Sequence, residues 1–590
     1  MQVVATAGHV DHGKSTLVRA LTGMEPDRLA EERRRGLTLD LGFAWTTLPS
    51  GEQLAFVDVP GHEKFVTTML AGVGPVPAVL LAVAADEGWM PQTEEHLAAI
   101  DALGVSHGVL VITRSDVADP KLALRQARER LAKTTLRACE AVTVSATTGA
   151  GLPELTAALD RLAARLPVPD PEAPVRLWID RAFTIAGSGT VVTGTLAAGT
   201  ITVGDELLLM PAGERVRVRA LESAKEPQET VSGVARVALN LRGVDRDRIE
   251  RGMALVTPGK WTFTTCIDVR VSSDEPSGRL ARQMILHLGS SATPVRLRPL
   301  GPDTARLTLN ARLPLHVGDV ALLRDPGRRA VAGVGILDVR PPTLVRRGAG
   351  AARARELASW PNRPGGKLVL RRRGVLRRDD LSIMGCTPPP DAVPLGTEWL
   401  ADPAYWEELH HKLTDELAEH AAAHPLAPGI PVEALRLRLG LPSRQLVASL
   451  VRPPLRLTEG RVYGPDTGLP PQAADAVKRL TADLGTSPFG APTADRLTDL
   501  GLTSHVIAAA ERTGAILRLP DGIVLLPGAD DEALRILKTL PQPFTVSQAR
   551  QALNTTRRVA MALLHHLDSR GLTHRTGETR SVPQPEDEGK

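Results

Sequence analysis

The first chemical feature of the chain is a loop that could bind phosphate. Residues 8–15 read GHVDHGKS, which fits the pattern G-x-x-x-x-G-K-[ST] of a phosphate-binding loop. The apolar pair at residues 3–4 predicts a buried strand before the loop, and residues 16–21 predict a helix after it. Backbone N–H groups at such a helix N-terminus attract an anion, Lys14 can reach the β and γ phosphates, and Ser15 can ligate Mg²⁺. The predicted nucleotide contacts in this loop are Asp11, His12, Gly13, Lys14, Ser15 and Thr16.

Two further segments supply the oxygen ligands that a nucleotide-bound Mg²⁺ needs. Residues 35–38 read RGLT, and we expect Thr38 to meet Mg²⁺ and the γ phosphate. Residues 58–62 read DVPGH and follow an apolar run that predicts a strand. We expect Asp58 to hold Mg²⁺ through water and the Gly61 N–H to contact the γ phosphate. The predicted metal ligands are therefore Ser15, Thr38 and Asp58.

Residues 113–116 read TRSD and predict a site for guanine. The Asp116 carboxylate can accept hydrogen bonds from guanine N1–H and N2–H₂, which adenine does not offer. The usual motif is N-K-x-D, so this chain departs from it twice. Thr113 replaces an amide that would hold the loop and the base, whereas the aliphatic stem and guanidinium of Arg114 can still cover the base.

A fifth element consists of Ser145 and Ala146, which follow an apolar stretch at residues 141–144 and whose backbone would contact guanine O6. Each element alone is weak or could match by chance. Five of them in the order of a GTPase, each at the end of a predicted strand, favour a GTP-binding domain.

His62 directly follows Gly61 and is the candidate catalytic residue. Hydrolysis needs a water molecule in line with the γ phosphorus, and an imidazole can orient it. Ras-like GTPases carry glutamine just after this glycine and translational GTPases carry histidine, so the chain resembles the latter. The alternative is a structural histidine on a loop.

Length and composition set the broad class. At 590 residues the chain predicts about four domains, and its 43% hydrophobic content supports sizeable cores. Aromatic residues make up only 3%, which argues against a broad aromatic platform for bases. Three scattered cysteines indicate a reducing compartment without disulfides or zinc. We find no apolar run of roughly 20 residues and no room for a signal peptide before the first strand, so we expect a cytoplasmic protein with no membrane contact.

Positive charge is concentrated in one segment. The formal net charge is only +4, but residues 346–378 hold eleven arginines and lysines with few acids between them. Two interpretations stay open. The segment is either a footprint for a phosphate backbone or a solvated surface of a chain that uses little lysine.

The chain divides by pattern into four stretches. Residues 1–166 alternate apolar strands with helical stretches and predict an α/β GTPase domain with a doubly wound sheet. Short strands with Gly, Pro and Asp turns then predict two β-barrels, at residues 174–260 and 262–345. Residues 350–590 are helical with recurring hairpins and predict tandem α/β winged-helix domains. A generic helical domain is the alternative for this last stretch.

The last winged helix is the clearest copy. We expect helices at residues 531–540, 547–553 and 556–569, followed by a wing at residues 571–580. Apolar side chains at i, i+4 and i+8 in the third helix would face the core, which leaves the opposite face outside. The arginines expected to point outward are Arg557, Arg558, Arg575 and Arg580, and the resemblance described below implies that they bind RNA. A solubilising surface is the alternative.

The motifs at residues 8–15, 35–38 and 58–63 resemble those of the elongation factor Tu group of translational GTPases. Two β-barrels after the GTPase domain are similar to that group, but the long helical extension is not. The extension, and the sequence LDLGF at residues 39–43, resemble the bacterial selenocysteine-specific elongation factors. The resemblance implies GTP and Mg²⁺ as cofactors. It also implies a monomer whose partners are selenocysteyl-tRNA, an mRNA hairpin and the ribosome.

The resemblance further implies a pocket in the first barrel for the amino acid esterified to tRNA, with Asp180, Arg181 and Arg236 at the matching positions. A selenol is ionised at neutral pH and serine is not, so two arginines beside one aspartate would favour the selenolate. Salt bridging on the barrel surface is the alternative.

We therefore expect a GTPase that delivers selenocysteyl-tRNA to a ribosome paused at a recoded stop codon. Two other functions stay open. One is another tRNA-carrying GTPase, such as an initiation-factor relative, and the other is a GTP-gated regulator whose winged helices bind DNA.

Overall fold

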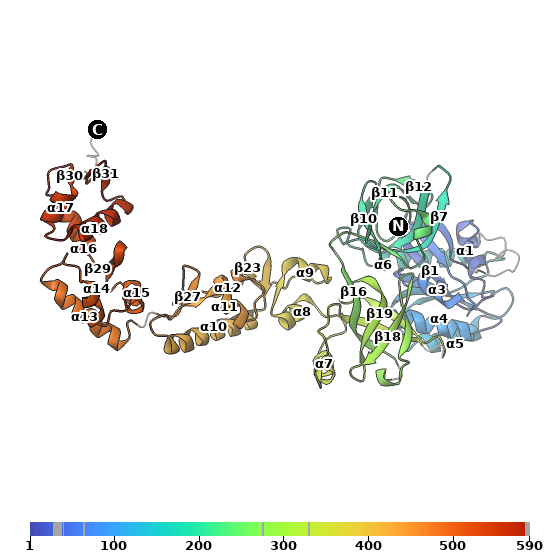
Figure 1. The fold of residues 1–590 in the computed structure, drawn as a ribbon. Coiled ribbons are helices and arrows are strands. Elements are labelled where there is room, and N and C mark those ends of the chain that lie inside the picture. The colour runs from blue at the N-terminus through green and yellow to red at the C-terminus, as the bar shows by residue number, and fades with distance from the viewer. Residues whose placement is uncertain are drawn as a thin grey trace. The chain divides into compact units, whose positions relative to one another are not determined.

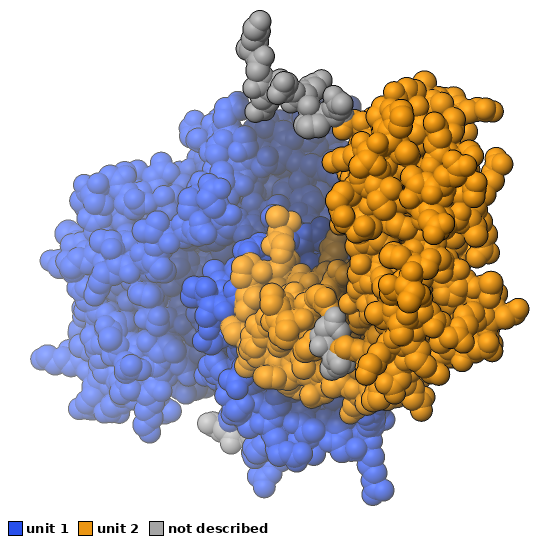
Figure 2. All heavy atoms as spheres, turned by 90° about the vertical axis from the view of Figure 1, so that its left-hand side faces the viewer, with its two compact units in different colours: residues 1–392, 398–400 blue, residues 393–397, 401–590 orange. Residues whose placement is uncertain are grey.

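A computed structural model gives the course of the chain, which is drawn in Figure 1. The chain divides into two compact units, residues 1–392 with 398–400 and residues 393–397 with 401–590 (Figure 2). The structure describes residues 1–26, 38, 40–62, 65–187, 189–273, 276–327, 331–465 and 468–583.

The N-terminal domain is built on a six-stranded sheet in the order β2-β3-β1-β4-β5-β6. Its strands are β1 (Gln2–Ala7), β2 (Gly42–Thr47), β3 (Gln53–Asp58), β4 (Ala78–Ala84), β5 (His107–Thr113) and β6 (Glu140–Thr143). β1 pairs in parallel with β3 and β4, whereas β2 runs antiparallel to β3. Unbroken apolar runs such as residues 78–84 form central strands because both faces of this sheet are covered.

Helices cover both faces of the sheet. They are α1 (Lys14–Thr22), α3 (Val66–Val73), α4 (Pro91–Ala102), α5 (Lys121–Leu131) and α6 (Leu152–Arg165). α1 and α6 pack on one face in a core that includes Leu17 and Leu159. α3, α4 and α5 pack on the other face, where Met69 and Ile100 are buried. The predicted doubly wound α/β domain is confirmed.

Two β-barrels follow in the first unit. The strands of the first are β7 (Arg176–Ile185), β8 (Gly189–Leu196), β10 (Glu206–Met210), β11 (Glu214–Ser223), β12 (Glu226–Gln228), β14 (Ala235–Arg242) and β15 (Ala254–Val256). They form a sheet in the order β10-β15-β7-β8-β14-β11-β12, which the pairing of β10 with β11 closes. The short strands β9 (Thr200–Thr202) and β13 (Thr230–Ser232) pair beside it.

The second barrel is closed in the order β16-β19-β18-β17-β20-β21. Its strands are β16 (Thr262–Ser272), β17 (Gln283–Leu288), β18 (Ser291–Pro299), β19 (Thr304–Leu315), β20 (Val320–Arg324) and β21 (Val331–Asp338). Buried and exposed residues alternate along β18, so one set of side chains fills the barrel. Both predicted barrels are confirmed.

Arg176 joins the two barrels. Its guanidinium donates to both carboxylate oxygens of Asp319, at 2.6 and 2.8 Å, and stacks over Trp261. Burial would raise the pKa of the Asp319 carboxyl, but the Arg176 charge outweighs this effect and holds the pKa below its usual range. The second barrel also lies against the N-terminal domain. Gly333 of β21 is so close to α4 that an added Cβ would lie 2.6 Å from the Ala102 carbonyl oxygen.

The arginine-rich segment is partly structural. Its helices are α7 (Ala349–Ala358), α8 (Gly366–Arg373) and α9 (Arg378–Ile383). The Arg353 side chain is 2% exposed, and it donates to Asp268 at 2.7 Å and to Asp338 at 2.6 Å. Arg372 pairs with Glu356 on α7. Ion pairs with the second barrel therefore hold α7 in place, and neither open interpretation of this segment applies to all of its arginines.

The described part of the second unit contains three groups of helices, each with a short hairpin. The first has α10 (Pro403–Ala423), β25 (Ile430–Pro431), α11 (Val432–Arg438), α12 (Arg444–Leu450), β26 (Arg456–Thr458) and β27 (Arg461–Tyr463). The second has α13 (Pro471–Gly485), α14 (Ala494–Asp499), α15 (Ser504–Arg512), β28 (Leu517–Leu519) and β29 (Ile523–Leu525). The third has α16 (Ala529–Leu537), β30 (Phe544–Thr545), α17 (Val546–Ala552), α18 (Arg557–Ser569), β31 (His574–Thr576) and β32 (Thr579–Ser581). The predicted tandem winged helices are confirmed.

α18 begins where a threonine caps it. The Thr556 hydroxyl accepts a hydrogen bond from the Val559 N–H at 3.3 Å, so the helix begins one residue after the expected start at residue 556. Val559, Leu563 and Leu567 are buried, as their spacing predicts. No helix in the described parts of the chain has both the length and the apolar character needed to cross a bilayer.

Candidate functional site

The predicted phosphate loop lies between β1 and α1 and is held from the side by α4. The Gly8 N–H donates to Nδ1 of His96 at 3.0 Å, and the Val10 N–H donates to the Gln92 side-chain oxygen at 3.1 Å. Burial lowers the pKa of His96 to about 3, so the ring stays neutral and can accept this bond. Sequence reasoning missed His96 and Gln92, because no local pattern links them to a loop 88 and 82 positions away.

Gly61 closes over this loop. The Lys14 ammonium donates to the carbonyl oxygens of Gly8 at 3.1 Å and His9 at 2.6 Å. A Cβ added at Gly61 would lie 2.7 Å from that ammonium nitrogen and 2.6 Å from the Val10 nitrogen, so only glycine fits here. The structure thus brings the first and third sequence elements together, as a contact of both with one phosphate requires.

The candidate catalytic histidine follows this glycine. The His62 ring is partly buried, and its centroid lies 6.0 Å from that of Phe65. The Phe65 N–H donates to the His62 carbonyl oxygen at 2.9 Å, which fixes the backbone at this position. Glu63, which belongs to the same motif, lies outside the described residues.

Oxygen atoms converge at the predicted metal site. The Ser15 hydroxyl donates to Asp58 at 2.6 Å and lies 3.0 Å from the Thr38 hydroxyl. Thr6 donates to the other oxygen of the buried Asp58 carboxylate at 2.6 Å. Two hydroxyls and one carboxylate are the hard donors that Mg²⁺ prefers, so these residues fit that ion. Residues 35–37 of the same motif lie outside the described residues.

The two departures from the guanine motif both brace the phosphate loop. The Thr113 hydroxyl donates to the His12 carbonyl oxygen at 2.8 Å. This hydroxyl therefore holds the phosphate loop, as the amide of the usual motif is expected to do. The Arg114 guanidinium pairs with Asp86 at 2.9 Å and donates to the Asp11 carbonyl oxygen. Arg114 therefore makes contacts with the loop that would reduce its freedom to cover a base.

Asp116 and the fifth element lie at the same edge of the sheet. Asp116 is exposed, whereas Ser145 is buried and its hydroxyl accepts from the Thr148 N–H at 3.1 Å. The Ser115 N–H donates to the Val144 carbonyl oxygen at 3.3 Å, which joins the two loops. Ala146 follows, half-buried. The structure therefore places the expected base-binding residues together.

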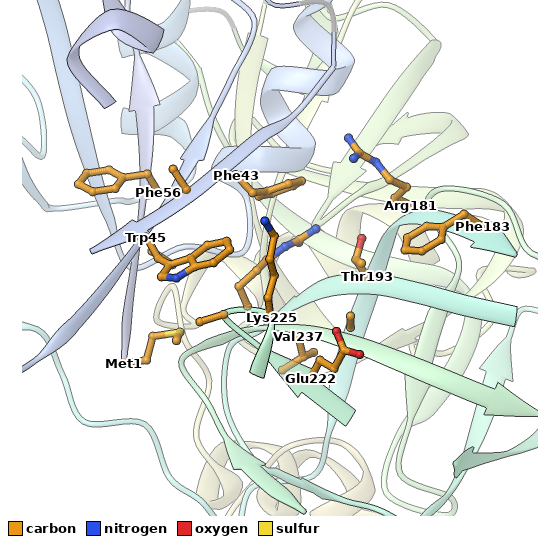
Figure 3. A pocket seen from close by; sticks show the side chains of 15 residues that line it. Met1, Phe43, Trp45, Phe56, Arg181, Phe183, Thr193, Glu222, Lys225 and Val237 are labelled. Carbon is orange, nitrogen blue, oxygen red and sulfur yellow. The ribbon is translucent and has the colours of Figure 1, made fainter. Parts of the chain in front are cut away.

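A cavity of about 180 Å³ lies between β2 and the first barrel (Figure 3). At its barrel side the buried Asp180 carboxylate accepts from both terminal nitrogens of Arg236 and, at 2.8 Å, from the Thr193 hydroxyl. The Phe43 ring of β2 lies 3.8 Å from the Arg236 guanidinium, and Arg181 also lines the cavity. The three residues expected to form an aminoacyl pocket are thus brought together.

The other wall of this cavity comes from residues that sequence reasoning missed. The Trp45 ring of β2 faces Lys225, whose ammonium lies 5.3 Å from the ring centroid (Figure 3). Arg181 donates to Asp40 at 2.9 Å and to the Leu41 carbonyl oxygen at 3.0 Å. Only the resemblance at residues 39–43 pointed to the segment that carries Asp40 and Leu41. The contact between this segment and the first barrel, which is distant in sequence, leaves no local sequence pattern.

The predicted RNA-binding arginines do not all face outward. Arg557, Arg558 and Arg575 are exposed. The expectation for Arg580 is wrong: it is 3% exposed, and its Nε donates to Asp568 at 2.8 Å. Side chains alternate along β32, so Arg580 points inward and braces the wing against α18. A cavity of about 380 Å³ beside the wing is lined by the side chains of Thr545, Arg550, Arg557, Arg575, Glu578 and Arg580, among others.

Known families match three parts of the chain. The model described as "Elongation factor Tu GTP binding domain" matches residues 1–165, and "Elongation factor Tu domain 2" matches residues 189–256. "Elongation factor SelB, winged helix" matches residues 535–582. These ranges contain the nucleotide site, most of the first barrel and the last winged helix.

Individual proteins extend these matches. The selenocysteine-specific elongation factor of Escherichia coli is 38% identical over 352 residues, which cover 58% of this chain and 56% of that protein. Elongation factor Tu 2 of Streptomyces avermitilis is 32% identical over 56% of this chain and 95% of its own length. A crystal structure of a bacterial selenocysteine-specific elongation factor, EF-Sec, is 25% identical and covers 99% of this chain and 100% of its own, with a TM-score of 0.74. The chain spans about half the length of the curated selenocysteine-specific relatives it matches.

Proposed function

Because the chain belongs to the elongation factor Tu family of GTPases, in its selenocysteine-specific branch, we propose that it binds selenocysteyl-tRNA with GTP and delivers it to the ribosome at a recoded stop codon. The observation that carries this proposal is that Arg181 and Arg236 line one cavity beside the GTPase domain, with Asp180 paired to Arg236. The proposed site of action is the cytoplasm, and the proposed working form is a monomer.

The proposed nucleotide chemistry uses groups from four loops. Lys14 and the backbone of residues 8–13 hold the β and γ phosphates, and Asp116 accepts from guanine. Ser15, Thr38 and Asp58 hold Mg²⁺, which supplies positive charge to the phosphates when it is bound. His62 orients the water that attacks the γ phosphorus. Gly61, which has no side chain to clash with the phosphate loop, lets the His62 backbone come close to that loop.

The proposed selectivity for selenocysteine is electrostatic. A selenolate entering the cavity gains charge-assisted hydrogen bonds from Arg181 and Arg236. A serine hydroxyl at the same place would leave these cations with a neutral partner after their water has been displaced. A cavity of about 180 Å³ suits a small side chain, and Phe43 keeps the cation of Arg236 against an apolar wall.

The proposed RNA contacts lie in the last winged helix. Arg557, Arg558 and Arg575 are exposed around the start of α18 and the wing. An mRNA hairpin would meet them through its phosphates and one or two unstacked loop bases. Two cations at a helix N-terminus oppose the helix dipole, so a polyanion at this place would stabilise them.

Binding of two aminoacyl-tRNAs to the GTP-bound protein tests the proposal. Selenocysteyl-tRNA should bind much more tightly than seryl-tRNA. Arg236→Met should weaken selenocysteyl-tRNA by roughly tenfold to a hundredfold, the worth of one charge-assisted contact, and leave seryl-tRNA nearly unchanged. Arg215→Met is the matched control, because Arg215 pairs with Glu206 on the exposed side of the barrel. Equal losses for both tRNAs would contradict the proposed pocket.

A further inference from the structure

One carboxylate of the GTPase domain holds two arginines of the first barrel. Asp40 accepts from Arg181 at 2.9 Å through one oxygen and from Arg251 at 2.7 Å through the other. All three side chains are about one-third exposed.

Asp40 lies two residues after a ligand of the metal site. Thr38 lies 3.0 Å from the Ser15 hydroxyl, where Mg²⁺ and the γ phosphate are proposed to bind. Only one residue separates Thr38 from Asp40, so their Cα atoms lie at most about 7 Å apart. The nucleotide site and the Asp40 carboxylate are therefore joined by a very short stretch of chain.

One of the two arginines held by Asp40 lines the proposed aminoacyl pocket, and the other contacts the backbone of a pocket residue. Arg181 lines the cavity itself. Arg251 donates from Nε to the Asp180 carbonyl oxygen at 3.0 Å, and its Nη1 lies 3.5 Å from the Thr68 hydroxyl on α3. Asp40 is thus connected through Arg181 to the cavity and through Arg251 to the Asp180 backbone and to α3, the helix labelled beside the sheet in Figure 1.

The charges around the pocket support a role for this bridge in selectivity. Arg181, Arg236 and Arg251 bring three guanidinium groups, and Asp40 and Asp180 bring two carboxylates. One net positive charge is left for one anionic side chain. Without Asp40, Arg181 and Arg251 would both lose their shared carboxylate partner, and the surplus of positive charge would be larger whichever nucleotide is bound.

We infer that Asp40 is a positioning residue that couples the nucleotide site to the aminoacyl pocket by holding Arg181 and Arg251 only while Thr38 stays at the metal site. This inference rests on the proposed function and names its regulation. Because coupling between two sites is reciprocal, GTP should strengthen selenocysteyl-tRNA binding by the same factor by which selenocysteyl-tRNA strengthens GTP binding.

The test uses the full chain and measures the Kd of selenocysteyl-tRNA with GDP and with a non-hydrolysable GTP analogue. Asp40→Asn and Arg251→Gln should each lower the ratio of the Kd with GDP to the Kd with the GTP analogue by about tenfold. The double variant should fall no further than the more affected single variant, because both changes remove one bridge. Glu206→Gln, which removes an exposed carboxylate of the same barrel, should leave the ratio unchanged.

The possible failures differ from one another. Ratios that stay unchanged in both variants would overturn the inference. Equal losses of affinity with GDP and with the GTP analogue would overturn it as well, because Asp40 would then only hold the pocket together. If the unmodified chain does not bind selenocysteyl-tRNA with either nucleotide, the proposed function fails first. Thermal unfolding checks that each variant is folded. If the Asp40→Asn variant does not fold, the Arg251→Gln variant alone tests the inference.

Discussion

At the scale of single residues, His62 is placed by its neighbour. Gly61 lies close to the phosphate loop, so the backbone of the next residue begins near the proposed γ-phosphate position. His62→Ala should slow ribosome-stimulated GTP hydrolysis by ~10²-fold or more, because the attacking water loses its orienting group. GTP and tRNA affinities should persist. Single-turnover hydrolysis by the variant at the unmodified rate would falsify this assignment, and His62→Gln tests whether another hydrogen-bonding side chain can replace the ring.

Asp116 carries the prediction on the base. Asp116→Asn keeps the size of the side chain but removes the carboxylate that accepts from guanine N1–H and N2–H₂. Preference should shift from GTP toward XTP, whose C2 carbonyl can accept from the new amide. Competition binding with the two nucleotides measures the shift, and Asp119→Asn, an exposed carboxylate in the same loop, is the control. Unchanged GTP affinity in the Asp116 variant would mean that residues 113–116 do not bind the base.

Local motifs predicted which residues meet at the nucleotide site. They did not predict residues such as His96, which reach the site from a distant part of the sequence. Lys14, Gly61 and Ser15 were identifiable from short spacings, since their motifs follow β1 and β3, which lie side by side and parallel in one sheet. His96 was not, because its only role visible here is to accept from a backbone N–H. Arg580 was expected outside because wing arginines often contact RNA, but strand alternation turns it inward.

At the scale of elements, α4 makes the phosphate loop sensitive to acid. The pKa of His96 is about 3 in the folded state, below the usual value near 6.5. The unfolded chain therefore binds a proton below about pH 6.5 that the folded chain does not, so stability falls as pH falls through this range. Between pH 7 and 5 this one group should cost the GTPase domain about 2 kcal/mol.

His96→Gln isolates this contribution. The glutamine side chain can still accept from the Gly8 N–H but cannot be protonated in this range. Calorimetry at pH 7 and 5 should show a smaller loss of stability in the variant than in the unmodified chain. His107→Gln, on β5 of the same domain, is the control and should keep the original pH dependence. Identical losses in all three proteins would show that His96 is not the sensor.

Element boundaries were predictable where the pattern was long. The helix expected at residues 556–569 is observed as Arg557–Ser569. Periodicity decides such elements because one apolar face must be buried. The arginine-rich segment had no such pattern to interpret: whether Arg353 meets solvent or Asp268 depends on a barrel strand far away in the sequence.

At the scale of the whole molecule, the order of patterns along the chain was enough to predict the fold class. An α/β stretch, two stretches of short strands and a helical stretch are observed as such. The contact between β2 and the first barrel was not predictable, because surfaces of separate domains pair through shape and charge. The resulting cavity and the Asp40 bridge depend on that pairing.

The division into two units separates the proposed activities. The GTP and aminoacyl sites lie in the first unit and the RNA-binding arginines in the second. In the full chain, Arg557→Gln with Arg558→Gln should abolish tight binding of the mRNA hairpin and reduce the salt dependence of residual binding by about one counterion per lost phosphate contact. GTP-dependent binding of selenocysteyl-tRNA should survive, because no residue of that site changes.

Arg535→Gln is the matched control for this last prediction, since Arg535 lies in the same winged helix but pairs with Glu532 on α16. Hairpin affinity is measured by titration, with duplex DNA of equal length as competitor. A double variant that keeps full hairpin affinity would move the RNA site away from α18. A chain that prefers the duplex DNA would instead favour the DNA-binding regulator, because a winged helix can place its third helix in a major groove, whereas a hairpin is recognised through its phosphates and its unstacked loop bases.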